Sequence, residues 1–235
     1  MLKPIFAGLV LGHGLLFAMQ AVAVPIIVPN ASFETPNVPD GGVSYSVPNW
    51  TITTGVGVHD QLDAQYPNAT GNLSPLPGMA DGYQDAFIYF NPASSPLFGS
   101  LSIAGLQTVG SDTRYQLTVA LGNRLDANPG PVTVALTVNG IVVSSSLISP
   151  SQMLEGTFTD FTVSFTTLPS GDPNVGGDLG ILLGMSQSTT DVLQANFDNV
   201  RLTAAPAPNG VPEPSTALLL ACSLTGLGIS RRKRA

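Results

Sequence analysis

The chain has a single cysteine among its 235 residues, so no disulfide can form within it. That residue, Cys222, lies in an apolar stretch near the C-terminus. A fold without disulfides depends for its stability on its hydrophobic core and on any metal that it binds.

Basic residues are also scarce, with 8 Lys and Arg against 15 Asp and Glu. Five of these cations lie near the two ends of the chain, which leaves only Arg114, Arg124 and Arg201 in the body. The body is therefore strongly acidic, and this disfavours nucleic acids and anionic membrane surfaces as partners. We expect no nucleic-acid partner.

The short motifs of common enzymes are absent from the sequence. It has no Gly-x-Ser-x-Gly elbow, no His-Glu-x-x-His and no phosphate-binding glycine loop. One histidine of the body, His59, precedes Asp60, but neighbours on a strand point to opposite faces and cannot form a catalytic pair by adjacency. The sequence therefore predicts a protein that is not an enzyme, with a secreted hydrolase as a weaker alternative.

Alternating apolar residues are the dominant pattern in the body. Residues 115–121 and 132–138 each alternate apolar with polar or small side chains, as half-buried antiparallel strands do. Asn139-Gly140 follows the second run and precedes another apolar run, a sequence that favours a tight hairpin. The apolar phase shifts at Asp198-Asn199, which predicts a β-bulge there.

Roughly eight to ten such strands, with Gly and Pro in the connections, fit one all-β domain. The predicted fold is an antiparallel two-sheet sandwich with jelly-roll topology over residues 24–203. Residues 68–85, rich in Pro, Gly, Asn and Asp, are predicted to form a long surface loop.

The N-terminus has the features of an export signal. Lys3 precedes an apolar run over residues 5–19, and Ala21-Val-Ala23 is a small-residue cleavage site. The sequence predicts a signal peptide over residues 1–23, cut after Ala23 by signal peptidase, with an uncleaved anchor as the alternative. We therefore expect the body to be exported through the inner membrane.

The C-terminus has three consecutive features after an Ala/Pro-rich linker at 204–210. They are a Pro-Glu-Pro motif, an apolar stretch over residues 217–229 that predicts a membrane helix, and a basic cluster that predicts a membrane stop. The motif and cluster residues are Val211, Pro212, Glu213 and Pro214, and Arg231, Arg232, Lys233 and Arg234. Residues 211–235 resemble the PEP-CTERM protein-sorting domain, which implies processing by an exosortase. An ordinary C-terminal membrane anchor is the alternative.

Two further motifs lie at opposite ends of the body. Asn30-x-x-Phe33-Glu34 and Asp198-Asn199-Val200-x-Leu202 are similar to segments of galactose-binding-like jelly rolls, which include carbohydrate-binding modules. The resemblance implies a structural Ca²⁺ held by Glu34 and Asp198. Such an ion would also relieve the repulsion between two carboxylates on adjacent first and last strands. Alternatively, Glu34 ends a strand in solvent and Asp198 caps a turn.

A glycan ligand requires exposed aromatic faces and polar partners. Tyr66 and Tyr83, in or near the predicted loop, are the candidate ligand-binding residues, although core packing is an equal alternative for both. Trp50 is interpreted as a packing residue.

Together these features predict an exported cell-surface or extracellular-matrix protein that is sorted by an exosortase and anchored in the membrane, at least transiently, by its C-terminal helix. Its non-catalytic domain is predicted to bind polysaccharide, and the PEP-CTERM resemblance implies the exopolysaccharide of a biofilm. The alternative is a structural or adhesive protein that self-associates through exposed strand edges.

Overall fold

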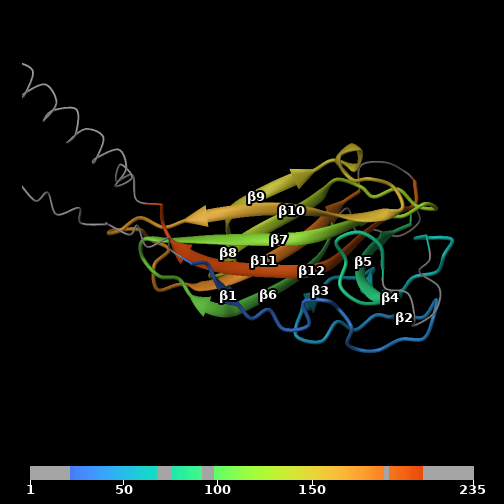
Figure 1. Cartoon of the computed structure of the whole chain (residues 1–235), viewed down its shortest axis with the longest axis horizontal. Coiled ribbons are helices and arrows are strands. Elements are labelled where there is room, and N and C mark those ends of the chain that lie inside the picture. The colour runs from blue at the N-terminus through green and yellow to red at the C-terminus, as the bar shows by residue number, and fades with distance from the viewer. Residues whose placement is uncertain (1–21, 68–75, 92–97, 188–190, 209–235) are drawn as a thin grey trace, which may run out of the picture. The chain divides into compact units, whose positions relative to one another are not determined.

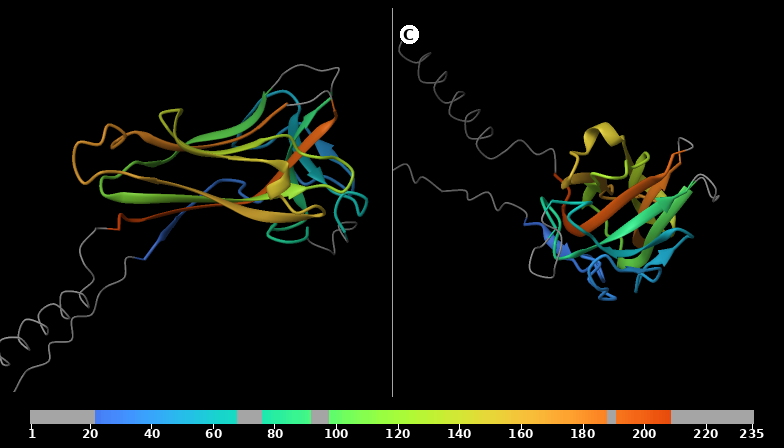
Figure 2. Two further views of the ribbon diagram at one scale, coloured as in Figure 1. Left: turned by 90° about the horizontal axis from the view of Figure 1, so that it is seen from above. Right: turned by 90° about the vertical axis from the view of Figure 1, so that its right-hand side faces the viewer.

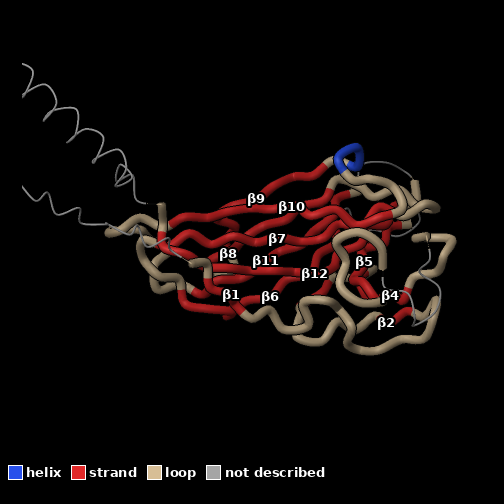
Figure 3. The backbone as a smooth tube through the Cα atoms, in the orientation of Figure 1, coloured by secondary structure: helices blue, strands red, loops and turns tan. Residues whose placement is uncertain are grey.

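The computed structural model describes residues 22–67, 76–91, 98–187 and 191–208. The predicted sorting tail, with residues 211–214 and 231–234, lies outside these ranges, as do residues 1–21 of the predicted signal peptide. Among the described residues, no helix is long and apolar enough to cross a bilayer. One short 3-10 helix, Pro150–Gln152, interrupts a body made of strands (Figures 1 and 3).

The strands form two sheets, seen as two layers in Figure 2. The first sheet has the order β10, β7, β12, β5, β4, β2, and β1 pairs with β12. Its strands are β1 (Val24–Ile26), β2 (Val43–Ser44), β4 (Val56–Asp60), β5 (Gln84–Phe90), β7 (Thr113–Asn123), β10 (Thr157–Thr166) and β12 (Leu193–Pro206).

The second sheet has the order β3, β6, β11, β8, β9. Its strands are β3 (Thr51–Ile52), β6 (Phe98–Thr108), β8 (Val132–Val138), β9 (Ile141–Ile148) and β11 (Asp178–Ser186). All pairs within both sheets are antiparallel. The predicted all-β, antiparallel two-sheet sandwich is thus confirmed.

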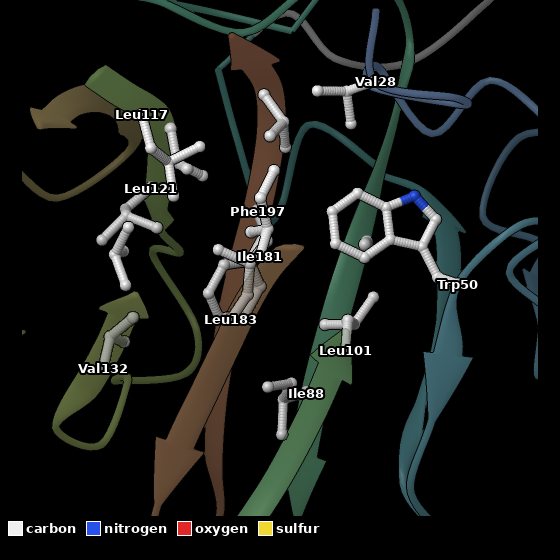
Figure 4. Packing of buried hydrophobic residues seen from close by; sticks show 14 of the residues in the cluster. Val28, Trp50, Ile88, Leu101, Leu117, Leu121, Val132, Ile181, Leu183 and Phe197 are labelled. Atoms are coloured by element: carbon white, nitrogen blue, oxygen red, sulfur yellow. The ribbon is translucent and has the colours of Figure 1, made fainter. Parts of the chain in front are cut away.

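The hydrophobic core lies between the two sheets (Figure 4). Leu117 and Leu121 of β7 and Phe197 of β12 point into it from the first sheet, and Ile181 and Leu183 of β11 point into it from the second. All five side chains are fully buried. Because successive side chains of a strand point to opposite faces, one face of each sheet lies in the core and the other face lies outside it.

Two local predictions are confirmed. Asn139 and Gly140 connect β8 to β9 with φ of +51° and +77°, the left-handed backbone that a two-residue hairpin turn requires. The register of β12 against β7 shifts between Asp198 and Arg201, and Asn199 there has φ of +45°. The shift changes which residues of β12 face the core, as expected of a bulge.

The predicted loop over residues 68–85 differs from the structure at its end. β5 begins at Gln84, so Asp85 is a strand residue and not a loop residue. Residues 204–206 belong to β12 and pair with β7, although their Ala/Pro composition predicted a spacer. The longer connections gather at the end of the sandwich where β2, β4 and β5 lie, and they cover part of the outer face of the first sheet (Figure 3).

Candidate functional site

A buried acid, Asp85, lies on the outer face of the first sheet. Its neighbours in the chain, Gln84 and Ala86, point to the opposite face of the sheet. Asp85 pairs with His59 of the adjacent strand β4. An outer-face carboxylate normally meets solvent, but the Asp85 side chain is fully buried, and the Gln61 side chain lies against it. Burial of a carboxyl group is costly unless it is hydrogen-bonded or neutral.

Two amide side chains bind the Asp85 carboxyl group. Gln61 Nε2 lies 3.0 Å from Oδ1 and 2.9 Å from Oδ2, and Asn196 Nδ2 lies 2.7 Å from Oδ1. Both partners are fully buried. They come from a loop 24 residues before Asp85 and from β12, 111 residues after it. The fold thus assembles this cluster from three distant segments.

Burial raises the pKa of the Asp85 carboxyl group well above its usual range. The hydrogen bonds from Asn196 and Gln61, and the charge of Arg124, act in the opposite direction without offsetting burial. The protonated form of Asp85 therefore persists to a higher pH than that of an exposed aspartate. A carboxylic acid held neutral in a water-poor site can donate its proton to a bound molecule.

The cluster has hydrogen-bonding capacity that the described residues leave unused. Gln61 Oε1, Asn196 Oδ1 and the Tyr66 hydroxyl group are buried and have no hydrogen-bond partner among the described residues. Buried polar atoms are almost always paired, with protein or with water. Their coincidence around one buried acid is the arrangement expected of a site that receives a polar molecule.

Tyr66 forms part of the cover over this face. Its ring packs against Phe158 at a centroid distance of 4.8 Å, and its hydroxyl group lies above Gly122 of β7. Gly122 pairs directly with Asn196, which donates a hydrogen bond to Asp85. The Tyr66 hydroxyl group therefore lies over the strand position next to Asn196. A side chain at position 122 would occupy the place of the Tyr66 hydroxyl group.

Gly122→Ala is expected to lower the free energy of unfolding by about 1–3 kcal/mol, because overpacking forces neighbouring side chains to shift. The added Cβ would collide with the Tyr66 hydroxyl group and lie 2.7 Å from the Phe158 ring. Urea unfolding measures the change, and Gly110→Ala is the matched control because its Cβ would meet no atom closer than 3.2 Å. Equal stability of Gly122→Ala and the parent protein would contradict this packing.

Two other titratable groups lie beside the cluster. Burial, and then the charge of Arg124, lowers the pKa of His59 to about 4, so its imidazole is neutral at pH 7. Arg124 is itself paired, because its Nε and Nη2 atoms each donate a hydrogen bond to the Asp126 carboxylate at a distance of 2.7 Å. The site therefore has no free buried cation among these groups.

The predicted metal ligands Glu34 and Asp198 meet the same short segment. Glu34 Oε1 accepts hydrogen bonds from the backbone N–H groups of Tyr83 and Gln84, at 2.7 and 2.9 Å. Asp198 Oδ2 accepts one from the N–H group of Asp81, at 2.6 Å. Both carboxylates thus fix the backbone just before Asp85.

Asp198 Oδ1 is buried and has no partner among the described residues. Burial raises the pKa of Asp198 well above its usual range, and the nearby Asp85 and Glu34 carboxyl groups add to the rise. In the described part of the chain, no three His, Cys, Asp or Glu side chains come together as a metal site. A cation here would need backbone oxygens in addition to these two carboxylates.

The predicted ligand-binding tyrosines have different positions. Tyr66 is fully buried over the Asp85 cluster, whereas Tyr83 is half-buried in the segment that Glu34 holds. Trp50 packs in the core and donates from Nε1 to the Pro29 carbonyl, which agrees with its interpretation as a packing residue. Sequence reasoning missed Asp85, Gln61 and Asn196. Only the position of Asn196 inside the predicted final strand gave any indication of its place.

A family model, HpiC1-like or HpiC1 cyclase, matches residues 24–203. A Stig cyclase, Fisc, from Fischerella sp. TAU was solved in complex with (3Z)-3-(1-methyl-2-pyrrolidinylidene)-3H-indole. It is 25% identical and has a TM-score of 0.64 over 79% of this chain and 100% of that chain. An apo cyclase from Fischerella sp. is 26% identical, with a TM-score of 0.63 over 80% and 98% of the two chains. No curated protein matches the chain.

These matches correct the functional interpretation drawn from the sequence. The prediction of a PEP-CTERM, exosortase-sorted, polysaccharide-binding protein of a biofilm matrix is wrong, as is the prediction that the protein is not an enzyme. The alternatives of an adhesive protein and a hydrolase are overturned by the same findings. The motif around Glu34 lies in the connection between β1 and β2, and the motif around Asp198 lies in β12, the last strand. Such segments occur in sandwich proteins of different function. The chain belongs to the HpiC1-like cyclase family.

Proposed function

We propose that this protein is a cyclase that uses Asp85 as a general acid to close a ring on an indole-bearing substrate. The single observation that carries the proposal is the fully buried Asp85 carboxyl group, whose pKa burial raises, within a cluster of unused hydrogen-bonding atoms. Family membership supports ring closure as the reaction class. The indole derivative bound by Fisc supports the substrate class.

The proposed reaction is an isomerisation, so its atoms balance without a co-reactant. The Asp85 carboxylic acid protonates a C=C or C=N bond of the substrate, and the electron-rich indole ring attacks the cation that forms. One new carbon–carbon bond closes the ring, and the proton lost from the attacked ring carbon returns to the Asp85 carboxylate. The product has the mass of the substrate and one more ring.

The surrounding residues favour each step of this reaction. The amide N–H groups of Gln61 and Asn196 already lie within hydrogen-bond distance of the Asp85 oxygens, so they stabilise the carboxylate when the proton leaves. Burial keeps water from trapping the substrate cation. Gln61 covers the acid, so the substrate must displace its side chain to reach Oδ1 or Oδ2.

The test is the conversion of indoles that carry a tethered alkene or imine, followed by liquid chromatography and mass spectrometry. The proposal predicts at least one product of unchanged mass that forms only with active protein. An Asp178→Asn variant, which alters an exposed carboxylate, should form the same product. Failure of every tethered indole to yield an isomer would overturn the proposal.

We also propose a structural Ca²⁺ beside Glu34 and Asp198. The unpartnered, buried Asp198 Oδ1 atom supports it, since a cation would satisfy this oxygen and relieve its repulsion from Glu34. The remaining ligands would be backbone carbonyl groups and water. The ion would stabilise the segment that precedes Asp85.

Calcium at about one hundred times its Kd is expected to raise the free energy of unfolding by about 2.7 kcal/mol, because it binds the folded state alone. Thermal unfolding with Ca²⁺, with Mg²⁺ and with chelator measures the effect. Asp198→Asn should abolish the response to Ca²⁺. Identical transitions of the parent protein in all three conditions would rule out the ion.

Three further sequence predictions stay proposals. The two-sheet order supports the jelly-roll topology, and β1 begins directly after the proposed cleavage site at Ala23. Export of the body follows from that signal peptide, and the N-terminal sequence of the protein purified from its own cells would test it.

A further inference from the structure

Three aromatic rings gather around Phe87, two residues after Asp85, on the outer face of the first sheet. Phe87 follows Asp85 by two residues on β5, so its side chain points to the same side about 6.7 Å further along the strand. The ring of Tyr45 meets Phe87 edge-on, at a centroid distance of 6.0 Å and an angle of 76°. The ring of His59 also meets Phe87 edge-on, at 6.2 Å and 76°. We call Tyr45, His59 and Phe87 the aromatic cluster.

Exposure rises along this row of residues. Asp85 is fully buried, Phe87 is 4% exposed and Tyr45 is 71% exposed. A tyrosine that is held in place by a buried ring, and still leaves most of its surface free, offers a rigid contact surface at low entropic cost. Tyr45 thus lies at the exposed end of this row, and Asp85 lies at its buried end.

A groove lies beside Tyr45. Its volume is about 550 Å³, and it is lined by Tyr45 and by residues 52–56, the turn from β3 to β4. This volume is within the range of small-molecule sites. The groove residues carry no charged side chain, so they suit an uncharged ligand group.

Gly57 makes this arrangement possible. It pairs with Phe87 across β4 and β5, and a Cβ at this position would collide with the Ser44 carbonyl oxygen and lie 3.0 Å from the Phe87 ring. Only glycine lets the chain before Tyr45 close over β4 while Phe87 keeps its place. The aromatic cluster is thus built into the backbone of the sheet and is not a chance surface contact.

The cluster is electrically neutral under ordinary conditions. With its pKa lowered to about 4, His59 carries no charge at pH 7. Neutral rings bind other aromatic rings edge-on or with an offset, and such pairs gain stability beyond simple burial. Taken together, these features select a flat, uncharged aromatic group.

We infer that the groove at Tyr45, with the edge of Phe87, is the subsite that binds the planar aromatic end of the substrate and directs its reacting end toward Asp85. This inference rests on the proposed cyclase function. It assigns recognition to residues that take no part in proton transfer.

Binding of 4-(1H-indol-3-yl)butan-2-one to the full chain, measured by isothermal titration calorimetry, tests the inference. Tyr45→Ala should weaken binding about tenfold through loss of the ring contact, whereas Tyr45→Phe keeps the ring and should bind within about twofold of the parent protein. Phe98→Ala, which removes an aromatic ring that is 42% exposed on the other sheet, is the control for nonspecific aromatic binding and should leave affinity unchanged. Circular dichroism should confirm that all variants are folded.

The outcomes separate the subsite from the cyclase function. If Tyr45→Ala binds as tightly as the parent protein, or if the parent protein does not bind the probe, the subsite is wrong. If Tyr45→Ala weakens binding but no tethered indole is cyclised, the subsite stands and the proposed reaction fails. Where cyclisation occurs, Tyr45→Ala should raise KM about tenfold and leave kcat near its parent value.

Discussion

Asp85→Asn is expected to lower the rate of cyclisation by about 100- to 10,000-fold, the usual contribution of a general acid. Asparagine has nearly the shape of aspartic acid and can still accept hydrogen bonds from Gln61 and Asn196, but it cannot transfer a proton. The fold should therefore persist while the reaction stops. Single-turnover measurement of isomer formation gives the rate, and Asp178→Asn should match the parent protein.

The pH dependence of the rate should carry the same information. Only protonated Asp85 can donate, and burial raises the pKa of this group, so activity should fall as the pH rises through that pKa, above the pH at which an exposed aspartate ionises. A variant at position 85 that cyclises at the parent rate, or a rate that rises where Asp85 ionises, would show that another group supplies the proton.

The second large effect is on stability, where Asp85→Asn should become more stable relative to the parent protein as the pH rises. The folded-state pKa of Asp85 lies above its unfolded value, so the folded state holds a proton that the unfolded chain releases above about pH 4. The stability that this group contributes is complete below the unfolded pKa and is lost as the pH rises toward the folded pKa. For a single proton the loss is at most about 1.4 kcal/mol per pH unit.

Comparison of Asp85→Asn with the parent protein cancels the pH-dependent stability contributed by the titratable groups that both proteins contain. Burial, and then the charges of Asp40 and Glu34, raises the pKa of Asp60 to about 6, so Asp60 also favours low pH. His59 acts oppositely, because its pKa of about 4 in the folded state makes stability fall as the pH drops below about 6.5. Urea unfolding of both proteins across this range measures the difference, and parallel curves would mean that Asp85 ionises normally.

The architecture of this protein could be predicted because strands have a local sequence pattern of alternating apolar and polar residues. Alternation over residues 115–121 predicted β7, and Asn139-Gly140 predicted a hairpin, since each pattern depends on residues that are neighbours in the chain. The register shift after Asp198 could be predicted for the same reason.

The candidate site could not be predicted in this way, because its residues meet only after folding. Asp85 follows a run of Pro, Gly, Asn and Asp, and this composition predicted a loop although the strand begins one residue earlier. Tertiary contacts override the local composition here. Gln61 and Asn196, which are 24 and 111 residues away in the chain, donate hydrogen bonds to the buried Asp85 carboxyl group. Nothing in the local sequence identifies those partners.

The functional class was missed for a related reason. A single buried carboxylic acid can act as a general acid without any short motif around it, whereas hydrolases and metalloproteases have motifs that a sequence reveals. The prediction that the protein is not an enzyme followed from the absence of such motifs. The proposed role of Asp85 depends on its burial, which the sequence alone does not report.

The ionisation of Asp85 is the most direct test of this account, measured by ¹³C NMR of the aspartate carboxyl groups during a pH titration. We predict one carboxyl resonance that is missing from Asp85→Asn and that titrates at a higher pH than an exposed aspartate does. If the resonance that disappears in Asp85→Asn instead titrates below about pH 5, as an exposed aspartate does, Asp85 is an ordinary carboxylate and cannot be the acid of the reaction.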